Sequence, residues 1–573
     1  MLKANLILSL RDVVGRSQVL VTSRGTRRYW QGYRTEPGHG STRSGMLAVV
    51  RPGTLVELWR VLRVLVAQEV AIIVQAANTG LTGGSTPDDR IDRPVVIINT
   101  MRLQGIHLVA GGTQVICLPG ATLHRLEKVV RAVGREPHSV IGSSCFGASV
   151  IGGVCNSSGG ALVRRGPAYT EAALFARIEA DGTLRLVNRL GVDLGDDPET
   201  MLARLEQGDL VEGTEILPAS DPDYHDHVRA IDEATPARFN ADPRRLHDAS
   251  GSAGRLVVFA VRLDTFFREE AGATFYLGTN DPGELTDLRR RLLSAGQDLP
   301  VSAEYLHRDA FDIADRYGRD TFIAIRLLGT DRLPLLFALK ARVDGFGAAI
   351  GLADLSERIL QRIGRLLPDH LPARLRQWRA RFEHHLILTI GADSLAPTRD
   401  MLAEMLPSAS GDLFECTADE ASRASLHRFV TAGAAVRYRA VHRKTTSGIV
   451  ALDVALPRNA ADWFAALPET LDDEVVAVLR YGHFLCHVFH RDYIIRRSAE
   501  ASAIKAELVR RLDEEGAEYP AEHNVGRQYR AKPALAAFYK ALDPTNRLNP
   551  GIGMTPTGPS WGEQTMKQEE SHD

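Results

Sequence analysis

The chain has 573 residues, which is too long for a single hydrophobic core, so we expect two to four domains. Apolar residues make up 44% of the sequence and charged residues 24%, which is the composition of a soluble globular protein. The net charge of −2 gives no global case for nucleic-acid binding, and no run of eighteen uncharged apolar residues is present to span a bilayer.

Strands and helices are expected to alternate in the first part of the chain. Apolar runs predict strands at 46–50, 71–74, 95–98 and 114–118. Thr54 and Glu57 form the pattern of a capping box for a helix that continues to about Gln68, and a second helix is expected from Thr122 to Val133. This alternation predicts βαβ units.

The stretch from Gln75 to Ser85 follows a predicted strand and is rich in glycine. Its Gly80, Gly83 and Gly84 lie among small hydroxyl and amide side chains. Glycine lets the backbone approach a ligand closely, so that successive N–H groups can converge on an anion. No lysine follows the glycines and no G-x-G-x-x-G opens a helix, which excludes the nucleoside-triphosphate loop and the usual dinucleotide fingerprint. The alternative is an ordinary turn rich in glycine and serine.

Two further glycine-rich stretches follow, at 141–160 and 249–258. The longer one carries no charged residue, whereas a surface loop usually does, so we expect a buried groove lined by small polar groups. The shorter one continues from its glycines into a predicted strand. Stretches of this kind beside buried strands suit a long cofactor whose pyrophosphate lies across the edge of a sheet.

A new domain is expected from about Phe267, where strands and helices begin to alternate again. Within it, the segment 311–385 has a different character. Asp354 and Glu357 form a second capping-box pattern, and the helix that they begin has apolar residues at helical spacing with arginines between them. A cluster of arginines then surrounds Trp378: Arg374, Arg376, Arg379 and Arg381. This combination suits an interfacial membrane contact, and the alternative is a core helix with a charged outer face.

A group of histidines and a carboxylate lies toward the C-terminus. His483 and His490 are seven positions apart, and Glu522 and His523 follow. Two imidazoles and a carboxylate are a suitable ligand set for a borderline divalent cation, and a further imidazole can serve as a base because its pKa lies near working pH. The spacing places the first two histidines two turns apart on a helix or on opposite faces of a strand. Histidines with a purely structural role are the alternative.

Four segments resemble the bacterial quinone-dependent D-lactate dehydrogenase family: 75–87, 134–144, 165–171 and 521–526. The three glycine-rich stretches in their order are also similar to the flavin-binding domain of the p-cresol-methylhydroxylase/vanillyl-alcohol-oxidase (PCMH/VAO) type. The likeness extends from about Ala48 to Gly553. It implies an α+β fold with a PCMH/VAO-type FAD-binding domain, an α/β cap domain for the substrate and a basic helical insertion that binds a membrane.

The resemblance also implies where these parts lie. The FAD-binding domain would occupy 1–266, with a core of about 42–213, and would be completed by 520–573. The cap would occupy 267–519, and the membrane-binding insertion 311–385. The residues implied for FAD are Ala76, Ala77, Asn78, Thr79, Gly80, Gly84, Ser85, Gly142, Ser149, Gly159 and Val258.

In the wider family of FAD-linked 2-hydroxy-acid dehydrogenases, a His-x6-His pair and a later Glu-His pair line the substrate site. By position, this implies His483, His490 and Glu522 as ligands of a divalent metal, Zn or Mn, and His523 as the base that takes the hydroxyl proton. Arg428 would anchor the substrate carboxylate, since a guanidinium pairs with a carboxylate through two hydrogen bonds.

The function implied is oxidation of D-lactate to pyruvate, with electrons passed to membrane quinone in the respiratory chain and neither NAD nor nucleic acid as a partner. The protein would attach electrostatically, as a peripheral protein, to an anionic phospholipid surface at the cytoplasmic face of the bacterial inner membrane. One alternative is an FAD enzyme for another D-2-hydroxy acid, such as 2-hydroxyglutarate or glycolate. Others are a zinc hydrolase built on the His483 group and a membrane-surface adaptor that uses 311–385.

Overall fold

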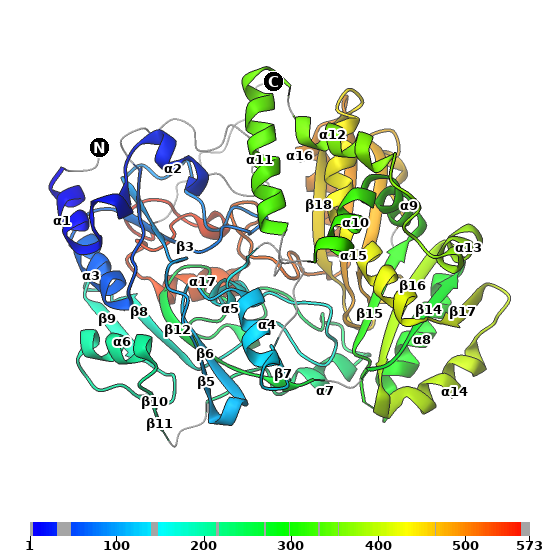
Figure 1. The fold of residues 1–573 in the computed structure, drawn as a ribbon, viewed down its shortest axis with the longest axis horizontal. Helices are drawn as coiled ribbons and strands as arrows, with labels where there is room; N and C mark the ends of the chain where they lie inside the picture. The colour runs from blue at the N-terminus through cyan, green and yellow to red at the C-terminus, as the bar shows by residue number, and fades with distance from the viewer. Residues whose placement is uncertain are drawn as a thin grey trace.

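The computed structural model describes residues 4–30, 47–138, 147–213, 217–268, 271–296, 298–329, 333–352, 354–464 and 466–562. Figure 1 shows two halves side by side. One half contains the blue and cyan N-terminal elements together with the red C-terminal segment. The other half, which we call the cap, contains the elements that lie between these in sequence.

The first sheet has four strands, of which the apolar runs predict three. Its order is β1 (Val19–Leu20), β2 (Leu47–Val50), β4 (Val95–Asn99) and β3 (Ala71–Gln75). Both β2 and β3 run parallel to β4, and α3 (Leu55–Val66) connects β2 to β3, which confirms a βαβ unit. The hydroxyl of Thr54 caps α3 by accepting a hydrogen bond from the N–H of Glu57, while the Glu57 carboxylate accepts from Gly53.

The second sheet differs from the βαβ expectation because it is antiparallel. Its order is β5 (Ile106–Val109), β6 (Gln114–Cys117), β12 (Val257–Asp264), β8 (Ala173–Ile178) and β9 (Leu184–Asn188). Short turns join β5 to β6 and β8 to β9, and connections of this length can join only antiparallel neighbours. The strand predicted at 114–118 is therefore confirmed, but the βαβ pattern does not continue through it.

Helices and short strands complete this half. They are α1 (Ala4–Val14), α2 (Ser23–Trp30), α4 (Leu123–Arg131), α5 (Val150–Cys155), α6 (Pro198–Gln207), β7 (Arg135–Glu136), β10 (Val192–Asp193), β11 (Val211–Glu212) and β13 (Phe266–Phe267). Helix α7 (Tyr224–Arg229) instead packs against the hydrophobic core of the cap. The predicted helix at 122–133 is confirmed as α4, although it ends at Arg131 and leaves Val133 exposed beyond its end.

The cap is organised around one antiparallel sheet, the cap sheet. Its strands are β14 (Ala271–Thr279), β15 (Ser302–His307), β16 (His384–Gly391), β17 (Gly411–Glu415), β18 (Thr446–Ala455), β19 (Val475–His483) and β20 (Val488–Arg496), in the order β17-β14-β16-β15-β19-β20-β18. One face packs against α8 (Pro282–Ser294), α14 (Leu395–Met405) and α16 (Ala501–Glu514). The opposite face packs against α9 (Arg308–Tyr317) and α15 (Ala418–Val441).

The segment between β15 and β16 is helical, as the sequence predicts. After α9 it forms α10 (Arg319–Leu328), α11 (Leu333–Ala349), α12 (Leu355–Gly364) and α13 (Ala373–Arg381). In Figure 1, α11 stands apart from the body of the cap. Among the described residues, no helix combines the length and the apolar character that crossing a bilayer requires.

The C-terminal segment returns from the cap to the first half. After α17 (Pro533–Leu542), Leu548 pairs with Ile72 as a parallel bridge, and the amide of Asn549 donates to the backbone oxygens of Gly84 and Ala253. The fully buried Arg255 donates to Asn546, Leu548 and Thr555. These hydrogen bonds hold the end of the chain against β3 and the glycine-rich stretches.

Candidate functional site

His483 and His490 lie on the two strands of one hairpin. β19 ends at His483, a tight turn follows, and β20 begins at Val488. In the antiparallel register His490 lies opposite Tyr481, so both histidines are on the same face of the cap sheet, with 5.6 Å between their ring centroids. The hairpin therefore brings together two side chains that a single helix or strand would hold further apart.

Glu304 of β15 contacts both His483 and Arg428. Its Oε1 accepts a hydrogen bond from Nδ1 of His483 at 2.6 Å, and its Oε2 lies 3.0 Å from Nη2 of Arg428. Burial raises the pKa of Glu304, but the charges of His483 and Arg428 outweigh burial, so its pKa lies below the ordinary value. The guanidinium that we predict to anchor a substrate carboxylate thus already has one carboxylate partner.

Glu522 lies on the other side of His483. Its Oε2 is 3.3 Å from Nε2 of His483, and its Oε1 accepts a hydrogen bond from the buried Arg238, which also donates to the backbone oxygen of Gly160. Burial lowers the pKa of His483, but Glu304 and Glu522 outweigh it and raise that pKa to about 10. For Glu522, burial raises the pKa, and the charges of His483 and Arg238 bring it down to about 2.

Asp453 of β18 connects His490 to His523. Its Oδ2 accepts hydrogen bonds from Nδ1 of His523 at 2.8 Å and from the backbone N–H of Glu522 at 2.7 Å, and its Oδ1 is 3.3 Å from Nδ1 of His490. The His523 side chain is 35% exposed, against 18% for His490 and 11% for His483. An incoming molecule therefore reaches His523 more easily than the other two histidines.

The three predicted metal ligands come together. One ligand atom from each of His483, His490 and Glu522 lies within 4.8 Å of the others. In both histidines Nδ1 faces a carboxylate, Glu304 or Asp453, which is the arrangement in which protein histidines present Nε2 to a metal. Nitrogen and oxygen donors of this kind fit Zn²⁺ or Mn²⁺.

His487, a further histidine of the same hairpin, does not belong to this group. Its ring is fully buried beside Phe484 and Phe489, and Nδ1 contacts the backbone oxygen of Pro457. Burial, reinforced by the charge of Arg289, lowers the pKa of His487 well below its usual value. The ring has a structural role in the turn, so it is not available as an alternative base.

The loop after β3 contains backbone donors that no described residue engages. Among the described residues, the backbone N–H groups of Ala77, Thr79 and Gly80 have no hydrogen-bond acceptor. A side chain added at Gly80 would meet open space. Gln75 fixes the base of this loop by donating to the backbone oxygens of Tyr29 and Ser85, and Ser85 donates to Asn78. Free amides on a fixed loop fit the phosphates of FAD.

The same loop also holds the segment that carries Glu522 and His523. The hydroxyl of Thr82 donates to the backbone oxygen of Asn524, and the backbone N–H of Arg527 donates to the backbone oxygen of Thr82. Gly526 has a positive φ of 56°, and a Cβ there would collide with Thr82, so the close contact requires glycine. The loop after β3 is therefore in direct contact with the segment that carries Glu522 and His523.

The other residues expected to hold FAD have varied positions. Gly142 lies outside the described residues. Ser149 caps α5 through its hydroxyl, which accepts from Gly152, and the side chain of Val258 is buried in the core of the antiparallel sheet. Gly159 lies directly against Glu522, so that a Cβ there would strike the carboxylate. Of these three, Gly159 is the one that links the second glycine-rich stretch to the histidine cluster.

Helix α12 turns its polar side inward and its apolar side outward. The buried Glu357 pairs with Lys340 and Arg437, whereas Ile359, Ile363 and Leu366 are 41%, 46% and 87% exposed. More exposed apolar side chains lie on or next to α10 and α11: Leu327, Leu328, Leu339, Phe346, Ile350 and Leu352. We call this set the apolar helical surface. The exposed Arg362 and Arg365 form no ion pair with any described residue.

The capping box expected at Asp354 is wrong, and the arginines around Trp378 have partners that the sequence does not reveal. Asp354 has a positive φ of 56° and its side chain does not cap α12; Asp344 of α11 instead accepts hydrogen bonds from the backbone N–H and the hydroxyl of Ser356. The arginines around Trp378 are not free, because each pairs with a carboxylate: Arg374 with Glu420, Arg376 with Asp369 and Asp315, Arg379 with Asp312, and Arg381 with Asp412. This cluster holds α13 in place.

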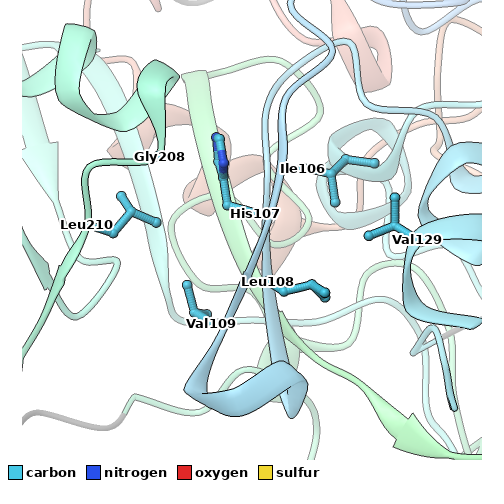
Figure 2. Close-up of a pocket in the computed structure, with 7 residues that line it drawn as sticks. All are labelled: Ile106, His107, Leu108, Val109, Val129, Gly208 and Leu210. Atoms are coloured by element: carbon cyan, nitrogen blue, oxygen red, sulfur yellow. The ribbon is translucent and has the colours of Figure 1, made fainter. Parts of the chain in front are cut away.

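A hollow of about 430 Å³ lies elsewhere, between β5 and the end of α6 (Figure 2). It is lined mainly by apolar side chains of β5, and the ring of His107 lies close to Gly208. None of the predicted site residues lines it, so it is separate from the histidine cluster.

Sequence reasoning missed three charged residues of the cluster: Asp453, Glu304 and Arg238. Asp453 and Glu304 interrupt apolar strands, and Arg238 lies in an irregular segment between the second and third glycine-rich stretches. A charged residue in a buried strand is itself a signal, because a buried charge is costly unless it has a partner. The partners, however, lie on other strands and cannot be read from the local sequence.

Comparison with known proteins gives matches along nearly the whole chain. The family described as "FAD binding domain" matches residues 46–185, and the family described as "D-lactate dehydrogenase, membrane binding" matches residues 274–561. The quinone-dependent D-lactate dehydrogenase of Haemophilus influenzae is 50% identical over 97% of this chain and 99% of that relative. The proteins of the same name from Escherichia coli and Corynebacterium glutamicum are 49% and 43% identical, over 97% and 96% of this chain and 97% of each relative.

Solved structures share the fold at low sequence identity. 4-Ethylphenol oxidase from Gulosibacter chungangensis aligns with a TM-score of 0.57 and 12% identity over 96% of both chains. p-Cresol methylhydroxylase aligns with a TM-score of 0.58 and 13% identity, again over 96% of both chains. The expected PCMH/VAO-type α+β fold is thus confirmed.

Proposed function

The chain belongs to the quinone-dependent D-lactate dehydrogenase family, and from that premise we propose that it oxidises D-lactate to pyruvate and passes the electrons to a membrane quinone. It is an FAD-dependent oxidoreductase. The observation that carries the proposal is the cluster around His483, His490, Glu522 and His523, which the protein joins directly to the cofactor loop through Thr82. We assign residues 1–266 and 520–573 to the FAD-binding domain, 267–519 to the cap and 311–385 to the membrane-binding insertion.

The chain's residues divide the work of the reaction. FAD, held by the free amides of the loop after β3 and by the glycine-rich segment that ends at Gly160, supplies the acceptor for the hydride of the substrate α-carbon. His523 takes the hydroxyl proton, since loss of hydride alone would leave a protonated carbonyl. Arg428 binds the substrate carboxylate with the guanidinium donors that Glu304 leaves available.

A divalent cation at His483, His490 and Glu522 would polarise the hydroxyl oxygen of the substrate. The two carboxylates that face the Nδ1 atoms support this assignment. We expect Zn or Mn in the purified protein by elemental analysis. Loss of that metal in the His490→Ala variant, with partial recovery of activity on adding it back, is the expected result; full activity in metal-free protein would contradict it.

Anaerobic reduction of the flavin tests which substrate the enzyme oxidises. We expect the purified protein to be yellow and its flavin absorbance to bleach within the first turnover with D-lactate but not with L-lactate. D-2-hydroxyglutarate should bleach it more slowly, because its second carboxylate would need a further cation besides Arg428. Glycolate should also be slower, because it lacks the methyl group of lactate. Bleaching that is fastest with one of these acids would assign the enzyme to that substrate instead, and a colourless protein would contradict the proposal.

The loop after β3 can be tested through Gly80. The Gly80→Val variant should fold normally, because a side chain there meets no other residue, but it should retain little FAD since the branched chain occupies the space of the cofactor. The flavin-to-protein absorbance ratio is the measurement. Gly448→Val is the matched control, because that glycine also faces open space but lies on β18. Equal flavin content in both variants would show that this loop does not bind FAD.

The role of His523 as the base can be tested by substitutions that preserve the fold. His523→Ala should slow flavin reduction by D-lactate about 10²–10⁴-fold, the usual contribution of a positioned base, with little change in substrate affinity. His523→Gln should not recover the rate, because an amide cannot accept the proton. Single-turnover stopped-flow absorbance is the measurement. A rate within about threefold of wild type, well below a general-base effect, would rule out His523.

Membrane association follows from the membrane-binding family match over 274–561. We propose that the protein attaches peripherally to the cytoplasmic face of the inner membrane through the apolar helical surface, with Arg362 and Arg365 at the anionic headgroups. Exposed apolar side chains flanked by arginines suit the interfacial region of a bilayer. Each arginine contributes on the order of 1 kcal/mol near an anionic surface, so the attachment has both an apolar and an electrostatic component.

Vesicle binding separates these components. The Ile363→Asp variant should bind anionic vesicles about 10- to 100-fold more weakly, since it loses apolar burial and adds a negative charge. High salt should release wild-type protein only partly, because apolar insertion is not screened. Leu8→Asp, at a 55% exposed leucine of α1, is the matched control and should bind normally. Complete release of the wild-type protein by salt, together with normal binding of Ile363→Asp, would show that the attachment is electrostatic and has no apolar component.

A further inference from the structure

We propose that Asp453 is a positioning residue: it holds His523 in the tautomer in which the ring can act as a base. This inference rests on the proposed function, specifically on His523 as the base. No part of the sequence resemblance assigns a role to Asp453, and the inference comes from its contacts alone.

Three hydrogen bonds join Asp453 to the segment that carries His523. The backbone oxygen of Asp453 accepts from the N–H of Ala521 at 3.0 Å. Its Oδ2 accepts from the N–H of Glu522 at 2.7 Å and from Nδ1 of His523 at 2.8 Å. One residue of the cap sheet therefore contacts three consecutive residues of the segment, which sets the position of the His523 ring as well as its orientation.

The carboxylate also determines which ring nitrogen carries the proton. The Oδ2 atom of Asp453 accepts the backbone N–H of Glu522, so this oxygen is a hydrogen-bond acceptor. Because the same oxygen lies 2.8 Å from Nδ1 of His523, Nδ1 is the ring nitrogen that donates a hydrogen bond to it. Nε2 is then the ring nitrogen that carries no proton.

This arrangement completes the proton balance of the reaction. As the O–H bond of D-lactate breaks, a new N–H bond forms at Nε2 of His523, and the hydride leaves with the C–H electron pair for the acceptor of the proposed reaction. The ring becomes an imidazolium, and its positive charge develops 2.8 Å from the Asp453 carboxylate. The carboxylate thus stabilises the charge that forms when the base takes up the proton.

Contact with His490 does not account for this geometry. Asp453 Oδ1 is 3.3 Å from Nδ1 of His490, whereas the shorter hydrogen bonds go to the 522–523 segment. A residue that served only to orient His490 would not need to bind the backbone of Glu522. The two carboxylate oxygens of Asp453 therefore contact both histidines, and the shorter contacts are with the segment that carries His523.

The Asp453→Asn variant tests the inference. It keeps the size of the side chain but can present an N–H₂ group to Nδ1, which allows the other tautomer and removes the lone pair from Nε2. We expect flavin reduction by D-lactate to slow by about 10²–10⁴-fold, as for loss of a base, and the solvent deuterium isotope effect to increase because proton transfer becomes limiting. Binding of pyruvate, followed by titration of the flavin spectrum, should change less than about threefold, since truncation of a base leaves ground-state binding in place.

Two further variants separate positioning from packing. Asp453→Glu keeps an acceptor-only carboxylate but fits less well. Its flavin should be reduced faster than that of Asp453→Asn if Asp453 selects the tautomer of His523. A slower reduction than in Asp453→Asn would mean that the shape of the side chain decides, and would overturn the inference. Asp492→Asn is the matched control: Asp492 is a buried carboxylate on the adjacent β20 that accepts from Tyr481, and the change should leave the isotope effect unaltered. Amide hydrogen exchange over 521–526 should rise in Asp453→Asn and not in Asp492→Asn.

A double variant distinguishes failure of this inference from failure of the base assignment. If Asp453 acts through His523, adding Asp453→Asn to His523→Ala should slow the reaction by less than about threefold beyond His523→Ala alone, because coupled residues are not additive. A further loss of about 10²-fold would overturn the inference, as would equal rates for the Glu and Asn variants. If flavin reduction is slow in His523→Ala but unchanged in Asp453→Asn, only this inference is overturned. If flavin reduction is unchanged in His523→Ala, the assignment of His523 as the base is overturned, and this inference with it.

Discussion

The segment Ala521–Arg527 is held from two sides, and the candidate site depends on this constraint. Asp453 of the cap sheet binds its first residues, and Thr82 of the loop after β3 binds Asn524 and Arg527. Because the two anchors belong to different halves of the molecule, the segment fixes the distance between the histidine cluster and the loop. A change at either anchor is therefore transmitted to His523, whose ring is the most exposed of the three histidines considered.

Charge pairing within the cluster explains how so many ionisable groups are buried together. Glu304 faces His483 and Arg428, Glu522 faces His483 and Arg238, and Asp453 faces His490 and His523. Burying a charge without a partner costs several kcal/mol, about 3–5 kcal/mol when one member of a pair is removed. Each carboxylate here has two cationic or protonatable neighbours, which fixes the orientation of the rings before any substrate binds. The price is that Arg428, expected to bind a substrate carboxylate, shares its guanidinium with Glu304.

Helix α12 shows how tertiary structure can reverse the usual interpretation of an amphipathic helix. Its apolar positions would normally face the core, yet Glu357 and Gln361 are buried and Ile363 and Leu366 are exposed. Buried partners make this possible, because Lys340 and Arg437 neutralise Glu357 and the side chain of Gln361 donates to the backbone of Arg316. Apolar side chains left in water do not stabilise the isolated protein. An exposed apolar surface of this kind is typical of a binding site for a membrane or another apolar partner.

The sequence alone determined the features that depend on local pattern. Apolar runs located β2, β3, β4 and β6, and Thr54 marked the start of α3. The glycine-rich stretches predicted a groove for a cofactor. The resemblance to a known family then supplied the cofactor, the reaction and the histidines, and the match to relatives confirms the family.

Only the tertiary structure decided which side chains meet. His483 and His490 come together because the residues between them form a hairpin turn, and Asp453 and Glu304 join them from strands that are distant in sequence. The same holds for the arginines around Trp378, which the sequence leaves as a basic cluster and the fold pairs with carboxylates. Local pattern follows the periodicity of one element, whereas charge pairing and the face that a helix buries depend on neighbours that only the folded chain brings into contact.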